Sequence, residues 1–62
     1  MKIKFKGTSD SNFTKNKIYT LVNLGTYQDI HTFIMAYIVN NDNEIVLIPY
    51  DNMNLFNDNW EM

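Results

Sequence analysis

The chain has 62 residues, a formal net charge of −2, 45% hydrophobic residues and no cysteine. This length allows a single domain, residues 1–62, and the apolar content excludes a disordered chain. Without cysteine, the core must form by packing alone and a thiolate zinc site is excluded. The longest apolar run, residues 33–39, is far shorter than the roughly 20 residues that span a bilayer. The N-terminus lacks an apolar run of signal-peptide length, so we expect a cytoplasmic protein without membrane association.

The N-terminal half predicts two strands. Ile3 and Phe5 alternate with lysines, which indicates a short strand with one solvated face. Residues 7–12 are rich in turn formers and predict a loop. Residues 17–24 are dominated by β-branched and aromatic residues, and Gly25 is expected to end or bend that strand.

The middle of the chain predicts a β-hairpin. Residues 31–39 are apolar on both alternating faces, which is typical of a strand covered on both sides. A helix over residues 27–38 is the alternative, because Phe33, Ile34 and Tyr37 also fit a helical stripe. Residues 40–43 (Asn-Asn-Asp-Asn) form a turn signal that joins this segment to a second β-branched run, residues 44–50.

The C-terminal segment predicts one helical turn and a last short strand. Pro49 is expected to interrupt the strand over residues 44–50. Residues 51–56 have the pattern of a helical turn with Asp51 as its cap, and residues 59–62 then complete the sheet. The sequence therefore predicts a mostly β domain, a small five-stranded SH3-like barrel with a short helical turn before the last strand.

Three short motifs in this order resemble a known group of proteins. Residues 13–19 (Phe-Thr-Lys-Asn-Lys-Ile-Tyr) resemble its Thr-Lys-Gly-Lys-x-Tyr opening. Residues 42–44 and then 48–50, ending in Leu55 and Phe56, resemble its hairpin and closing turn. The group comprises short SH3-like proteins of low-GC Gram-positive bacteria and their phages, most without an assigned activity. The resemblance covers residues 13–56 and implies an accessory protein of a phage or mobile element. Asn16 replaces the group's glycine, and asparagine tolerates the positive φ that such a turn requires.

The sequence predicts no catalytic residue, metal site or cofactor. His31 is the sole histidine, and the acidic residues do not follow the spacing of a calcium loop. Asp29 and His31 lie two positions apart and would share one face of a strand. We interpret them as a solvated junction between loop and strand, with a carboxylate–histidine pair as the alternative.

The lysines form the first candidate binding group. All five lie in the first 17 residues, so that segment carries +4 and the remainder −6. This grouping predicts a patch for an acidic protein or for nucleic acid; the alternative is an edge strand whose lysines prevent aggregation. The negative charge of residues 18–62 is too sparse to imitate duplex DNA. The candidate residues are Lys2, Lys4, Lys6, Lys15 and Lys17.

The aromatic residues form the second candidate group. There are nine, more than a core of this size buries, and tyrosine and tryptophan are common interface anchors. We expect Tyr50, Trp60 and Tyr27 at the surface, with Tyr50 and Trp60 sealing the open end of the barrel as the alternative. The sequence thus predicts a non-catalytic protein-interaction module with a host or phage protein as partner. Weak nucleic-acid binding through the lysines and self-assembly as a homodimer are the alternatives.

Overall fold

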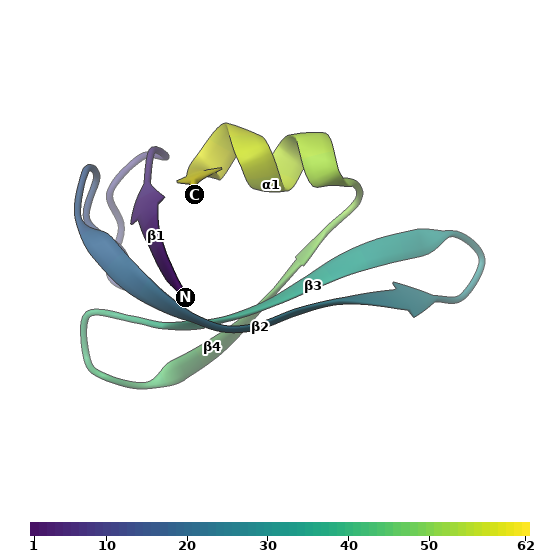
Figure 1. Ribbon diagram of the computed structural model, residues 1–62, viewed down its shortest axis with the longest axis horizontal. Coiled ribbons are helices and arrows are strands. Elements are labelled where there is room, and N and C mark those ends of the chain that lie inside the picture. The colour runs from purple at the N-terminus through teal and green to yellow at the C-terminus, as the bar shows by residue number, and fades with distance from the viewer.

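A computed structural model describes residues 1–62 and shows a mostly β chain with one short helix (Figure 1). The predicted five strands and the helix before the last strand are confirmed. The elements are β1 (Lys2–Phe5), β2 (Ile18–Gln28), β3 (Thr32–Val39), β4 (Ile45–Tyr50), α1 (Met53–Asn59) and β5 (Trp60–Glu61). The helix is neither long nor apolar enough to cross a membrane.

The strands form one antiparallel sheet in the order β4-β3-β2-β1-β5. Strand β2 pairs with β1 through its first residues and with β3 through the remainder, so it runs through both halves of the sheet. The two end strands, β4 and β5, do not pair with each other. The sheet is therefore not closed, and the structure does not show the barrel that the sequence predicted.

The bend of β2 lies before the glycine that was expected to cause it. Strand β2 continues through Gly25 to Gln28, and the register shifts between Leu21 and Asn23. A bulge of this kind inserts one residue, here Val22, and increases the local twist. It allows a single strand to serve both halves of the curved sheet.

Strand β1 is inside the sheet, which overturns the interpretation of its lysines as edge protection. It pairs with β2 on one side and with β5 on the other. Ile3 and Phe5 are 1% and 6% exposed, as the alternation predicted, while Lys2 and Lys4 face away from the core.

The β3–β4 hairpin forms as predicted, and the alternative helix over residues 27–38 is wrong. Ile34, Ala36 and Ile38 of β3 are buried on the inner face of the sheet, in register with partners on both neighbouring strands. Pro49 does not interrupt β4 but lies within it, opposite Met35. A proline is tolerated there because β4 is an edge strand with β3 as its one neighbour.

The helix begins one residue later than predicted and places the last aromatic residues in the core. Asn52, and not Asp51, is the N-cap, and its side chain accepts a hydrogen bond of 3.0 Å from the backbone N–H of Leu55. Phe56 and Trp60 are 0% and 2% exposed. They join the strand residues in one cluster: Ile3, Phe5, Phe13, Tyr19, Leu21, Ala36, Ile38, Phe56 and Trp60.

Candidate functional site

Trp60 is a core residue, so its expected position at the surface is wrong. Its ring centroid lies 4.9 Å from that of Phe5 and 5.0 Å from that of Phe13, and Tyr19 meets it edge to face at 6.0 Å. The reason is the pairing of β5 with β1, which sets Trp60 opposite Phe5 and turns both side chains inward. A partner cannot reach this indole while the domain is folded.

Tyr50 is half-buried at the end of β4 and is linked to Trp60. Its hydroxyl accepts a hydrogen bond of 2.9 Å from Trp60 Nε1, and its ring meets Phe56 edge to face. Burial raises the pKa of Tyr50 above its ordinary value, and the charge of Asp10 raises it further, although the bond from Trp60 lowers it. Tyr50 packs against the core cluster, so it is only partly at the surface. The barrel end that the alternative interpretation assigned to this pair is not formed, because the sheet is open.

Tyr27 is exposed, as expected. It lies near the end of β2 opposite Phe33, and 55% of its surface is accessible. The end of the β2–β3 hairpin extends away from the body of the domain (Figure 1). Ile30, in the connecting turn, is 96% exposed. The hairpin end thus presents two large side chains to solvent.

Lys2 and Lys4 lie together on the outer side of β1. Lys2 Nζ donates a hydrogen bond of 2.7 Å to Thr20 Oγ1 on β2, and Lys4 stands opposite Glu61 on β5. Their positive charge is therefore flanked by a hydroxyl and one carboxylate.

The other three lysines do not extend this pair into one continuous patch. Lys6 follows β1, and Lys15 is exposed in the β1–β2 loop. Lys17 turns toward the β3–β4 hairpin, where its Nζ lies 3.4 Å from Asn41 Oδ1 and 5.6 Å from the centroid of the Tyr19 ring. The predicted group of five is therefore divided, and only Lys2 and Lys4 share a strand face.

A feature that the sequence interpretation missed is an apolar outer face on the β3–β4 hairpin. The side chains of β3 that alternate with the core residues are half-buried, and their partners on β4 are exposed. The register sets Tyr37 opposite Leu47 and Val39 opposite Ile45, with Ile45 62% and Leu47 45% exposed. We call this surface the outer face; its residues are Phe33, Met35, Tyr37, Val39, Ile45, Leu47 and Pro49.

The signal for the outer face was present in the sequence. The apolar character of both faces of residues 31–39 predicted a strand covered on both sides. The structure provides the cover on one side only, because the core lies entirely on the inner face. An apolar face of this extent, left without cover, is typical of an interaction site.

His31 lies near Asp51, and not beside the Asp29 carboxylate that the alternative interpretation paired with it. Its Nε2 lies 3.9 Å from Asp51 Oδ1, and both side chains are exposed. Asp29 instead donates its backbone N–H to the carbonyl oxygen of His31 across the β2–β3 turn. An exposed pair at this distance is a solvated surface contact and adds little to stability.

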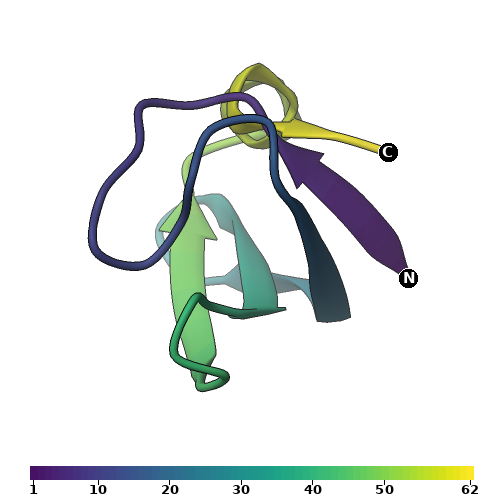
Figure 2. The same cartoon turned by 90° about the vertical axis from the view of Figure 1, so that its left-hand side faces the viewer.

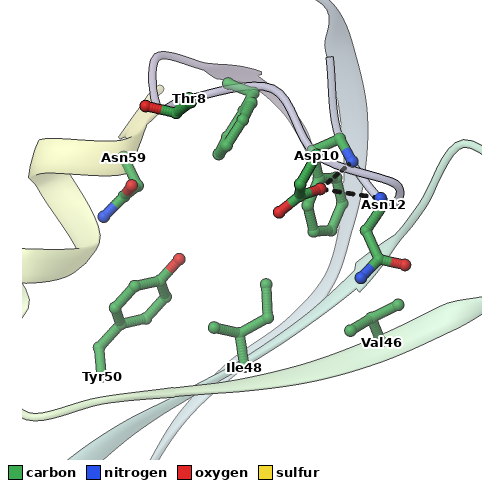
Figure 3. A pocket seen from close by; sticks show the side chains of 9 residues that line it. Thr8, Asp10, Asn12, Val46, Ile48, Tyr50 and Asn59 are labelled. Carbon is green, nitrogen blue, oxygen red and sulfur yellow. Dashed lines mark hydrogen bonds between the residues drawn. The ribbon is translucent and has the colours of Figure 1, made fainter. Parts of the chain in front are cut away.

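A pocket of about 390 Å³ lies beside the free edge of β4 (Figure 3). The β1–β2 loop passes the edge of β4 (Figure 2), and it contributes Thr8, Asp10, Asn12 and Phe13 to the lining of the pocket. Val46 and Ile48 form one wall, and Phe5 and Phe13 contribute aromatic surface. The loop is attached to the hairpin by a hydrogen bond of 2.8 Å from the Asn41 N–H to the Asn12 carbonyl oxygen.

Polar groups complete the pocket. Asp10 Oδ1 accepts hydrogen bonds of 2.8 Å from the backbone N–H groups of Asn12 and Phe13, which holds this carboxylate in place. The hydroxyl of Tyr50 points into the same space from the opposite side (Figure 3). Asp10 is the one charged residue among the nine that line the pocket.

Comparisons of this chain with known protein families, with curated proteins and with solved structures find no significant match. The function is therefore inferred from the surfaces of the chain itself. The outer face and the pocket are the two candidates, and they lie on opposite sides of β4 because successive side chains of a strand point to opposite faces.

Proposed function

We propose that this chain is a non-catalytic protein-interaction module that binds an acidic protein partner through its outer face. The observation that supports the proposal is the uncovered apolar surface of the β3–β4 hairpin, with Tyr37 and Leu47 paired at its centre. Removing apolar surface from water is favourable by about 25 cal/mol per Å², so covering this face with a partner favours binding. Tyrosine at the centre of such a patch is a common binding hot spot.

Charge complementarity supports the acidic character of the partner. Lys2 and Lys4 lie on the outer side of β1, and exposed Ile18 and Val22 of β2 continue that side toward the hairpin. Positive charges at the border of an apolar patch increase the rate of association with an acidic surface. The partner we propose therefore has an apolar patch bordered by aspartate or glutamate.

We further propose that the domain is SH3-like and cytoplasmic, and that it serves a phage or mobile element. The support is the resemblance of residues 13–56 to short proteins of that kind, together with the short helix between β4 and β5. Asn16, which replaces the glycine of that group, has a φ of 71°. This positive φ agrees with the turn that the resemblance implies.

The test compares capture of host proteins by the wild type and by matched variants. Leu47→Lys places a charge in the outer face, whereas Leu55→Lys makes the same change on α1, where Leu55 is 41% exposed. We expect the wild type and Leu55→Lys to capture a protein from a Gram-positive lysate, and Leu47→Lys not to capture it. This capture should persist when the lysate is treated with nuclease. Equal capture by Leu47→Lys and Leu55→Lys would exclude the outer face as the surface that binds the partner.

A second pair of variants tests the charge of the partner. Lys2→Gln and Lys4→Gln remove the two positive charges. Glutamine is chosen over glutamate because a glutamate at position 4 would lie opposite Glu61 and the two carboxylates would repel each other. With the purified partner, we expect association to slow in the variants and in added salt. An unchanged association rate contradicts an acidic partner, and capture that disappears after nuclease treatment identifies nucleic acid as the ligand instead.

Sedimentation of the wild type over a range of concentrations tests self-assembly. A monomer at all concentrations agrees with a separate partner. A dimer that Leu47→Lys dissociates would assign the outer face to a second copy of the chain and overturn the proposal.

A further inference from the structure

The geometry points to a second binding site, in which the pocket beside β4 takes a lysine or arginine side chain of a partner protein. The pocket lies on the inner side of β4, whereas the outer face lies on its other side, so the two sites do not overlap. This inference goes beyond the proposed function and does not depend on it.

The shape of the pocket suits a long, narrow side chain. Its volume of about 390 Å³ lies within the range of small-ligand sites. Ile48 and Val46 on one side and the ring of Phe13 on the other offer apolar contacts to an aliphatic stem. The methylenes of lysine and arginine side chains pack well against such surfaces while the charged end remains polar.

The polar groups select a cation at the end of that stem. Asp10 Oδ1 is occupied by two backbone N–H groups, and its second oxygen points toward the pocket (Figure 3). The hydroxyl of Tyr50 approaches the same space from β4. No lysine lines the pocket, so nothing in it neutralises Asp10. An anion would be repelled there, and an ammonium or guanidinium group gains a charge-assisted hydrogen bond.

The position of the carboxylate is fixed before the ligand arrives. Asp10 also donates its own backbone N–H to the Phe13 carbonyl oxygen at 2.9 Å. Three hydrogen bonds thus hold this short turn, while the aromatic core anchors Phe13, which is 3% exposed. Little freedom is lost when a cation binds to a group that is already oriented.

The free edge of β4 indicates that the cation belongs to a protein. Strand β4 pairs with β3 alone, so its other edge, which borders the pocket, has no neighbouring strand. An extended segment of a partner can follow such an edge and place one side chain in the adjacent pocket. A free amine has no backbone to lie along β4, so it would contact the pocket alone.

Nuclear magnetic resonance titration of the labelled protein with blocked amino acids tests this site. The probes are N-acetyl-lysine N-methylamide, the same derivative of arginine, and that of norleucine, which has the stem without the charge. We expect the two cationic probes to shift the amide signals of Asn12 and Phe13 and to bind about tenfold more tightly than norleucine. Equal binding of norleucine, or shifts confined to residues outside the pocket, would overturn the inference.

Matched variants separate the pocket from general attraction to an acidic chain. Asp10→Asn removes the charge but keeps an oxygen that accepts the two N–H groups, and Asp42→Asn removes one charge in the β3–β4 turn. We expect the first to weaken lysine binding about tenfold and the second to leave it unchanged. Equal losses in both variants would contradict a specific site. If Asp10→Asn does not fold, Asp10→Ser offers the same N–H groups a hydroxyl and gives the same test.

Two further comparisons identify the source of the cation and the independence of the site. n-Butylamine has the ammonium and its stem but no backbone, so we expect it to bind more weakly than blocked lysine; equal binding would assign the pocket to free amines. Leu47→Lys on the outer face should leave the binding of blocked lysine unchanged, and Asp10→Asn should leave capture of the acidic partner unchanged. Loss of both activities in either variant would contradict two separate sites.

Discussion

The indole N–H of Trp60 and the hydroxyl of Tyr50 form a hydrogen bond of 2.9 Å that connects β5 to the end of β4. These two strands stand at opposite ends of the sheet order and share no backbone ladder. The bond therefore joins the two ends of an open sheet through side chains, at the point where α1 passes from one strand to the other. It also gives the buried indole the partner that its N–H requires.

We expect Tyr50→Phe to lower the free energy of unfolding by about 1–3 kcal/mol, because it leaves the Trp60 N–H buried without an acceptor. Urea unfolding followed by the fluorescence of Trp60, the single tryptophan, measures the change. Tyr27→Phe is the matched control, since Tyr27 is 55% exposed and its hydroxyl has no protein partner among the side-chain hydrogen bonds. A similar loss in both variants would show that the bond is not the cause.

Local patterns predicted most of the fold. The alternation of Ile3 and Phe5 with lysines, and the asparagine-rich turn at residues 40–43, depend on neighbours a few positions away. Closure of the sheet into a barrel requires β4 and β5 to pair with each other, and no local sequence pattern determines whether these two strands meet. The N-cap of the helix is Asn52, whereas the sequence predicted Asp51. Aspartate and asparagine both suit this position, so the sequence alone did not distinguish them.

The candidate site was harder to predict because it depends on pairings between distant residues. Trp60 is buried through the pairing of β5 with β1, which joins residues from the two ends of the chain. Asp10 and Tyr50 approach the same pocket from segments 40 positions apart. The apolar outer face was visible as the double apolar pattern of residues 31–39, but the sequence did not show that only one face is covered.

The two glycines respond differently to a methyl group. A Cβ at Gly7 would lie 2.7 Å from Asn59 Oδ1 and 2.7 Å from the Phe5 ring, whereas a Cβ at Gly25 meets nothing within 4 Å. We expect Gly7→Ala to lower the melting temperature, because the tightly packed Phe5 must shift. Gly25→Ala should be neutral or raise stability by up to about 1 kcal/mol, since it reduces the freedom of the unfolded chain. Thermal unfolding by circular dichroism checks both, and a larger loss at Gly25 would contradict the packing described.

Asn16 and Asn43 have positive φ angles of 71° and 63° and use no side-chain hydrogen bond. We expect Asn43→Ala to cost about 1–2 kcal/mol, because alanine is unfavourable in the left-handed region, and Asn43→Gly to be neutral or stabilising. The same pair of changes at Asn16 should give the same signs. Asn57→Ala, on the exposed side of α1, is the control and should not destabilise. Equal effects of alanine and glycine at Asn43 would show that φ does not determine the cost.

Tyr50 makes the stability of the fold sensitive to alkaline pH. Its folded pKa is raised above the ordinary value of 10.0, chiefly by burial, with a further contribution from the charge of Asp10. As pH rises past 10, the unfolded chain therefore loses this proton before the folded chain does. The contribution of Tyr50 to the free energy of unfolding is complete below the pKa that Tyr50 has in the unfolded chain. It is lost as pH rises through the higher pKa that Tyr50 has in the folded chain.

Urea unfolding at pH values on both sides of 10.0 measures this loss, and the tyrosinate absorbance of the folded protein reports the ionisation itself. We expect Tyr50→Phe to reduce the alkaline decline in stability, because the variant has no hydroxyl to ionise. Asp10→Asn should give a smaller reduction, since it removes the charge contribution and leaves the burial of Tyr50 intact. An alkaline decline that is the same in the wild type and in Tyr50→Phe would show that other groups cause it.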